Sequence, residues 1–141
     1  MAKFRSSGTI FQRGDGGAPE TFSEITQAMD LEGPGTETDF EDTTTHTDAA
    51  ASNFKAYSPL MRDGGEVKTD VLWDPSLVSH IGLDADQAAS RLGNYRMVFP
   101  TSPVKTANFA GYVKDFSWKA PVKGMLTRSL VIKITGNVTI T

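Results

Sequence analysis

The sequence predicts a mainly β protein: an antiparallel β-sandwich of barrel-like character with one packed α-helix and a long exposed loop. Three observations predict it. Residues 94–141 contain three successive stretches of strand character, separated by connections that carry proline and glycine. Helical spacing of apolar residues is found at 76–92. Residues 43–65 have few apolar side chains and no clear period, which favours a loop.

The clearest strand is expected at 126–135, where apolar and polar residues alternate. A period of two is typical of a half-buried antiparallel strand. Arg128 interrupts the apolar face, and we expect its aliphatic stem to cover apolar surface while its charge stays in water. Residues 95–100 and 108–119 are expected to be the preceding strands of the same meander.

The N-terminal part is expected to begin with an extended arm at 1–8, followed by a short strand at 9–13. Residues 22–31 alternate well and predict one long strand that ends at a Gly-Pro-Gly sequence. Residues 37–43 are expected to pair back on that strand as a hairpin, with Phe40 facing inward. Two neighbouring strands would then present acidic side chains on the same side.

The loop expected at 43–65 carries four large apolar residues near its far end: Phe54, Tyr57, Leu60 and Met61. Apolar side chains gathered on an exposed loop indicate contact with another subunit.

The middle of the chain predicts a strand at 66–73 and then the helix at 76–92. Asp84 and Gln87 have the spacing of a capping box, which allows the helix to restart after Gly82. Gly93 is placed to terminate it. The order of strands, one helix and more strands is typical of a single domain, here 1–141.

Charge is divided unevenly along the 141 residues, although the net charge is only −3. Residues 14–54 hold ten acidic residues and no Lys or Arg, whereas residues 55–141 hold eleven basic and seven acidic residues. A chain divided in this way suits pairing with copies of itself, or the display of one sign of charge on one surface. Solvated loop positions explain any single acid, but explain ten in one window less well.

No pattern of catalytic or metal-binding residues stands out, so neither an enzyme nor a cofactor is expected. Cysteine is absent, which excludes disulfides and thiolate sites. His46 lies near acids without metal-site spacing and is expected to be solvated, and His80 is expected to be a partly exposed helix residue. The N-terminus lacks the apolar run of a signal peptide, and no stretch is long enough for a transmembrane helix.

Six stretches combine in a recognisable order: a strand with its turn, an acidic Thr-rich continuation, a strand leading to a helix, the helix exit with its strand, and two closing strands. They are 24–35, 39–45, 64–75, 91–100, 109–116 and 130–136. Together they resemble the major tail tube proteins of long-tailed bacteriophages with non-contractile tails, and the similar proteins of gene transfer agents. The resemblance covers nearly the whole chain. The C-terminal immunoglobulin-like domain of some members is not expected here.

The resemblance implies a structural virion protein with the tail tube fold. Such proteins form hexameric rings that stack into a tube around a tape-measure protein, and DNA passes through the lumen without specific binding. The implied partners are further copies, the tape-measure protein, a tail-tip initiator and a tail terminator. The implied location is the virion tail, after assembly in the host cytoplasm and without membrane insertion.

Two sets of residues follow as site candidates. An acidic wall repels DNA and lets it slide, whereas a basic wall would hold it. The candidates for the acidic lumen are Glu24, Asp30, Glu37, Asp39 and Glu41. The candidates for ring-to-ring contacts are Phe4, Arg5, Phe54, Tyr57, Leu60 and Met61, with the segment 136–141 as a further one.

Two alternatives remain open from the residues. One is a monomeric β-sandwich binding module, for example for carbohydrate, with Trp73 or Trp118 as a stacking platform. The other is a hydrolase that uses His46, for which the sequence indicates no substrate.

Overall fold

The structure is a computed structural model that describes residues 3–47, 51 and 53–141. Its elements follow one another as β1 (Ile10–Gly14), β2 (Phe22–Glu24), β3 (Ala28–Glu32), β4 (Glu37–Asp42), β5 (Tyr57–Asp63), β6 (Glu66–Leu72), α2 (Val78–Ala89), β7 (Gly93–Phe99), β8 (Lys105–Lys119) and β9 (Thr127–Ile140). The expected mainly β, antiparallel class is confirmed.

Seven strands form one antiparallel sheet in the order β2-β1-β7-β8-β9-β6-β3. Its two edge strands, β2 and β3, are consecutive in the chain and are joined by residues 25–27 alone. The sheet therefore curls until its edges approach each other, without a ladder between β2 and β3 in the described residues. The junction is held from both sides: Ile25 N–H donates to Phe11 O (2.8 Å), and Leu72 N–H donates to Gln27 O (3.0 Å).

The single long strand expected at 22–31 is therefore wrong. Its alternation is real, but the chain bends at Gln27, whose φ of 62° lies in the left-handed region. The first half pairs with β1 and the second half with β6. Alternation within a segment records which side chains face inward, and it does not record which neighbour completes the backbone hydrogen bonds.

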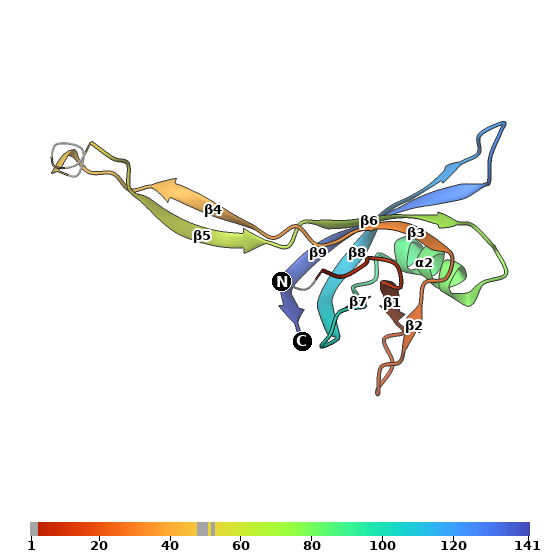
Figure 1. Cartoon of the computed structure of the whole chain (residues 1–141). Helices are drawn as coiled ribbons and strands as arrows, with labels where there is room; N and C mark the ends of the chain where they lie inside the picture. The colour runs from red at the N-terminus through yellow and green to blue at the C-terminus, as the bar shows by residue number, and fades with distance from the viewer. Residues whose placement is uncertain (1–2, 48–50, 52) are drawn as a thin grey trace.

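The core lies inside the curl of the sheet and against α2 (Figure 1). Rings of Phe11, Tyr95 and Phe109 stack with centroids 6.0 to 6.2 Å apart, which joins β1, β7 and β8. Leu83 of α2 is completely buried against them. Burying each such side chain contributes roughly 1.5–3 kcal/mol. The apolar face expected in the last strand is confirmed: Leu130, Ile132 and Ile134 are buried.

A second sheet consists of the β4–β5 hairpin alone, which extends away from the body (Figure 1). Three predictions are wrong here. Residues 37–42 pair with β5 and not with the 22–31 segment, and the loop expected at 43–65 contains a strand at Tyr57–Asp63. Phe40 is 62% exposed and not directed inward. The sequence does not predict β5 because Ser58, Pro59 and Arg62 have little strand propensity. The strand is instead stabilised by its backbone pairing with β4.

The helix α2 is shorter than the expected 76–92 and continuous through Gly82. It ends at Ser90, which adopts the left-handed cap conformation, whereas Gly93 already begins β7. Gly82 is a packing position: a Cβ there would lie 2.7 Å from Nη1 of Arg13. Within the described residues, no helix combines the length and apolarity needed to span a membrane.

His80 is completely buried, so the expected partial exposure is wrong. Asp74 N–H donates to its Nδ1 (3.1 Å), which leaves Nε2–H to donate to Thr26 O (2.9 Å). The ring thus ties α2 to the 25–27 junction. Both nitrogens are satisfied by backbone groups, which removes the usual penalty for burying a polar ring.

Arg128 corrects another expectation, because its charged group does not reach water. The residue is 1% exposed, its Nη2 donates to Phe116 O (2.7 Å), and its Nη1 pairs with Asp84 Oδ2 (2.9 Å). The guanidinium also lies over the Phe116 ring at 3.5 Å and the Trp118 ring at 3.9 Å. A carbonyl, a carboxylate and two aromatic faces replace its hydration.

Candidate assembly interface

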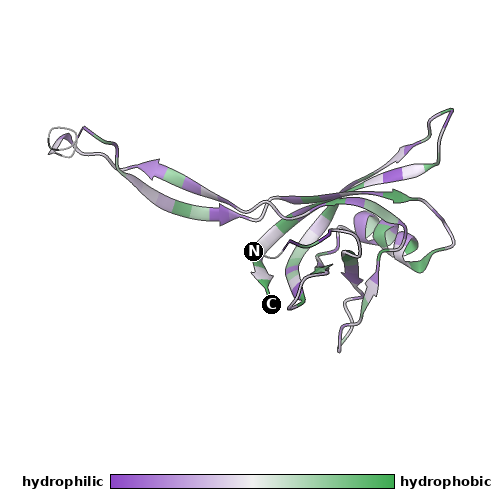
Figure 2. Cartoon of the chain, viewed as in Figure 1, coloured by the Kyte–Doolittle hydropathy of each residue, from purple (hydrophilic) through white to green (hydrophobic). Residues whose placement is uncertain are grey.

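The β4–β5 hairpin has an apolar face. Its register places Phe40 opposite Pro59 and Asp42 opposite Tyr57, and directly opposed residues project from the same side of an antiparallel pair. A bulge between Thr38 and Phe40 leaves Leu60 and Met61, both exposed, across from Asp39. Figure 2 shows hydrophobic and hydrophilic positions alternating along the hairpin. The hairpin thus offers apolar side chains without a body to bury them.

The opposite face of the hairpin is acidic. Glu37, Asp39 and Glu41 alternate with the apolar positions, and Asp63 lies opposite Glu37 in the register. On the face of Phe40 and Tyr57, at the far end of the hairpin, the pKa of Asp42 is lowered because the Thr44 hydroxyl and backbone N–H donate to its carboxylate. The hairpin therefore exposes both large apolar side chains and carboxylates, a combination that suits a protein interface.

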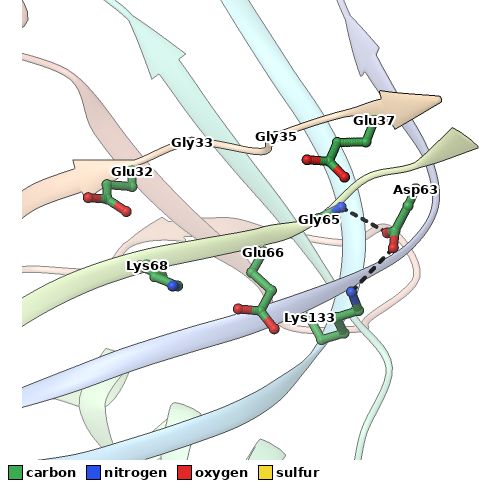
Figure 3. A pocket seen from close by; sticks show the side chains of 9 residues that line it. All are labelled: Glu32, Gly33, Gly35, Glu37, Asp63, Gly65, Glu66, Lys68 and Lys133. Carbon is green, nitrogen blue, oxygen red and sulfur yellow. Dashed lines mark hydrogen bonds and ion pairs between the residues drawn. The ribbon is translucent and has the colours of Figure 1, made fainter. Parts of the chain in front are cut away.

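The base of the hairpin is fixed by a small charged site (Figure 3). Asp63 accepts the Gly65 N–H (2.9 Å) and pairs with Lys133 Nζ (3.5 Å). These two groups lower the pKa of the Asp63 carboxyl. Gly65 has φ of +75°, and a Cβ there would lie 2.6 Å from Gly35 O, so a side chain would force the two chains of the base apart.

The cavity at this base measures about 400 Å³ and mixes charges of both signs. Its charged lining residues are Glu32, Glu37, Asp63, Glu66, Lys68 and Lys133. Among the described residues, no three His, Cys, Asp or Glu side chains lie close enough together to hold a metal ion. The Asp63–Lys133 pair joins the base of the hairpin to β9.

The predicted contact residues fall on two separate surfaces. Tyr57, Leu60 and Met61 lie on β5, and Phe54 is exposed in the connection before it. Phe4 and Arg5 instead line a surface groove of about 860 Å³ on the body, beside β3 and β7. That groove also exposes part of Met29 and contains Leu31, Met97, Phe99 and Pro100.

The five acidic lumen candidates are all exposed but do not form one strip. Glu24 lies on β2 and Asp30 on β3, at opposite edges of the seven-stranded sheet. The other three lie on β4. The expectation that neighbouring strands present acids on the same side is wrong, because β4 pairs with β5.

Sequence reasoning missed a third exposed surface, the tip between β8 and β9. Trp118, Val122, Met125 and Leu126 are all exposed there, and Val122 is fully so. The signal is present in the sequence, since Pro121 and Gly124 mark the connection, Val122 lies between them, and Met125 and Leu126 follow.

No family model and no curated protein matches this chain. Several solved structures match it in fold. The tail of an empty gene transfer agent particle with C6 symmetry matches with a TM-score of 0.80 and 8% identity, over 99% of both chains. The SPP1 tail tube matches with a TM-score of 0.69 and 7% identity, over 92% of this chain and 74% of that chain. The chain has the tail tube fold. The anti-feeding prophage baseplate also contains this fold, with a TM-score of 0.72, 6% identity, and 100% and 97% of the two chains covered.

Within this tail tube fold, the alternative site residues are poorly placed for ligand chemistry. Trp73 contacts Trp118 edge to face, with centroids 5.8 Å apart, and the Arg128 guanidinium lies over the Trp118 ring. The Arg128 guanidinium occupies one face of the Trp118 ring, so a sugar could stack only on the opposite face of that ring. His46 is exposed.

Proposed function

We propose that this chain is a structural subunit of a tail tube, in a phage or a phage-derived particle such as a gene transfer agent. Copies assemble into hexameric rings, and the rings stack into a conduit for DNA delivery. The observation that carries the proposal is the match to the C6-symmetric tail over 99% of both chains, which includes the hairpin as well as the body. The role is structural, without catalysis or a cofactor.

The edges of the curled sheet support assembly between copies. In the described residues no strand pairs beyond β2 or beyond β3, so both strands end the sheet with an outer side open to pairing. Open edges favour pairing with another chain, and a ring that joins them removes the hazard of uncontrolled aggregation. The apolar hairpin face and the groove beside Phe4 and Arg5 supply further surfaces for contacts between rings.

The lumen wall is assigned to the five exposed acids, Glu24, Asp30, Glu37, Asp39 and Glu41. A negative wall keeps DNA mobile because it offers no phosphate-neutralising cations. The tape-measure protein fills the lumen before DNA, and a tail-tip initiator and a terminator cap the two ends. The protein would reside in the virion tail after assembly in the host cytoplasm.

Electron microscopy tests the proposal directly. Purified protein, with and without tail-tip initiator complexes, is imaged by negative stain across a range of concentrations. We expect rings of six copies or hollow tubes. Protein that remains monomeric at every concentration, with initiator present, would overturn the proposal.

The lumen assignment has its own test. Particles carrying Glu24→Lys, Asp39→Lys and Glu41→Lys together are expected to assemble tubes of normal length yet eject DNA more slowly, because lysines bind phosphates. Lys105→Glu on the body serves as a charge-change control. Normal ejection combined with failed assembly would place these acids in an interface instead.

A further inference from the structure

The β8–β9 tip, residues 118–126, combines exposed apolar side chains with positive charge. Val122 and Met125 lie at its end, the latter 69% exposed. Lys119 and Lys123 are the charged residues of this segment, which contains no acid. Lys119 reaches Asp70 only at 3.6 Å and stays more than half exposed. A long two-stranded ribbon therefore ends in an apolar and basic surface that the rest of the chain does not cover.

The β4–β5 hairpin carries the opposite charge and also exposes large apolar side chains. Residues 37–63 hold six acids and two bases. The register places Asp42 opposite Tyr57 and on the same face as Phe40, whereas Glu41 lies opposite Ser58 on the other face. Among the described residues of this segment, none is buried.

The two projections extend from opposite ends of the molecule (Figure 1). They therefore cannot meet within one copy. We propose that the β8–β9 tip of one copy docks on the β4–β5 hairpin of a second copy. The apolar pair Val122 and Met125 packs on Phe40 and Tyr57, and Lys119 and Lys123 face Asp42. This contact rests on the proposed function, since it requires that copies assemble.

The geometry of such a contact is head to tail. Each copy gives one tip and receives one on its hairpin, and different surfaces meet at every junction. Contacts of this kind generate closed rings or helical stacks, whereas self-complementary surfaces stop at a dimer. The pairing of a basic surface with an acidic one also fixes which surfaces meet, because like charges brought together disfavour the wrong pairings.

Charge reversal with rescue tests the contact. Lys119→Glu with Lys123→Glu, or Asp42→Lys alone, is expected to raise the concentration needed for assembly at least about tenfold, because each change brings like charges together. Combining all three changes in one chain restores opposite charges and is expected to recover assembly. Lys105→Glu, exposed at the start of β8, is the matched control and should assemble as wild type does.

Cysteine trapping gives a second readout that does not depend on charge. The chain contains no cysteine, so Tyr57→Cys and Val122→Cys in one chain supply a single possible pair. Oxidation of assembled protein is expected to yield a ladder of covalent oligomers, and each single variant should yield dimers at most. A mixture of the two single variants should yield dimers that link different variants.

The outcomes separate the two proposals. Wild-type protein that never assembles, even with initiator, overturns the proposed function and with it this contact. Wild-type protein that forms tubes, while the Lys119→Glu, Lys123→Glu variant forms them equally well, overturns the contact alone. The same holds if assembled double-cysteine protein gives no ladder.

Discussion

The body around α2 and the β4–β5 hairpin use charge in opposite ways. In the body, Asp86 is 2% exposed and accepts bonds from Arg13 Nε (2.6 Å), Arg13 Nη2 (2.7 Å) and Arg91 Nη1 (2.9 Å). The Tyr95 hydroxyl approaches the same carboxylate at 3.4 Å. One buried carboxylate thus joins α2 to β1 and β7, and all of its partners come from the same chain.

In the hairpin, Glu37, Asp39 and Glu41 are exposed, and their carboxylates form no ion pair with any residue that the structure describes. Met61 is 83% exposed, although a similar side chain in the body, Met97, is buried. The difference teaches that the body is stabilised by contacts within the chain. The hairpin instead exposes apolar and charged side chains of the kind that form contacts between subunits. Changes in the body should lower stability, and changes in the hairpin should affect assembly.

The largest expected effect tests the body. Asp86→Ala leaves Arg13 and Arg91 partly buried without their shared anion and should lower the free energy of unfolding by about 3–5 kcal/mol. Glu41→Ala in the hairpin should change it by less than about 0.5 kcal/mol. Urea unfolding of both variants measures the contrast. Equal effects of the two substitutions would contradict it.

A smaller difference in stability is expected between alanine substitutions of a buried arginine in the body and an exposed arginine in the hairpin. Arg128→Ala removes the bonds to Phe116 O and Asp84 and should cost roughly 2–3 kcal/mol, because charged hydrogen bonds are lost in a buried setting. Arg62→Ala on exposed β5 should cost less than about 0.5 kcal/mol. Thermal unfolding followed by circular dichroism is the measurement. If Arg62→Ala proves as costly, the hairpin would have stabilising contacts of its own.

Apolar truncations should separate stability from assembly. Ile132→Val in the core is expected to cost about 0.5–1.5 kcal/mol and to leave the assembly concentration unchanged. Leu60→Ala on the hairpin should leave the monomer within about 0.5 kcal/mol of wild type and raise the assembly concentration. Urea unfolding and light scattering provide the two readouts. If Ile132→Val impaired assembly, or if Leu60→Ala lowered the stability of the monomer, the proposed difference between body and hairpin would be wrong.

The smallest effect concerns pH. Burial raises the pKa of Asp86, but the bonds and charges of Arg13 and Arg91 outweigh burial and lower it overall. A lowered pKa means that the stabilisation is complete above the unfolded value of about 4 and is lost as the pH falls through the folded value. Unfolding midpoints between pH 6 and 2 should therefore fall less in Asp86→Asn than in wild type. Parallel curves would show that Asp86 contributes no acid sensitivity.

Several elements were accessible from the sequence because their periodicity coincides with burial. The expected strand at 66–73 corresponds to β6, where Val67, Thr69 and Val71 are buried on one face. The strand expected at 126–135 corresponds to β9 for the same reason, although β9 continues to Ile140. The helix was found by its spacing, with its ends placed two and three residues too far out.

The site was accessible only in part. Tyr57, Leu60 and Met61 were recognised as exposed apolar residues, and they are exposed. Their strand was not recognised, because it forms through pairing with β4 and not through its own propensity. The β8–β9 tip was missed because an exposed turn and an exposed interface have the same composition until the flanking strands are seen to extend beyond the body.

The sequence by itself determined the β class, the division of charge and the inward-facing residues of β6 and the first part of β9, because each depends on side-chain type and local spacing. The tertiary structure decided that residues 22–32 divide between two sheet edges, that β4 and β5 form a separate hairpin, and that Arg128 and His80 are buried. Those features depend on partners distant in the chain. A charged or polar side chain can be buried only where such partners satisfy it, and no local pattern specifies where they are.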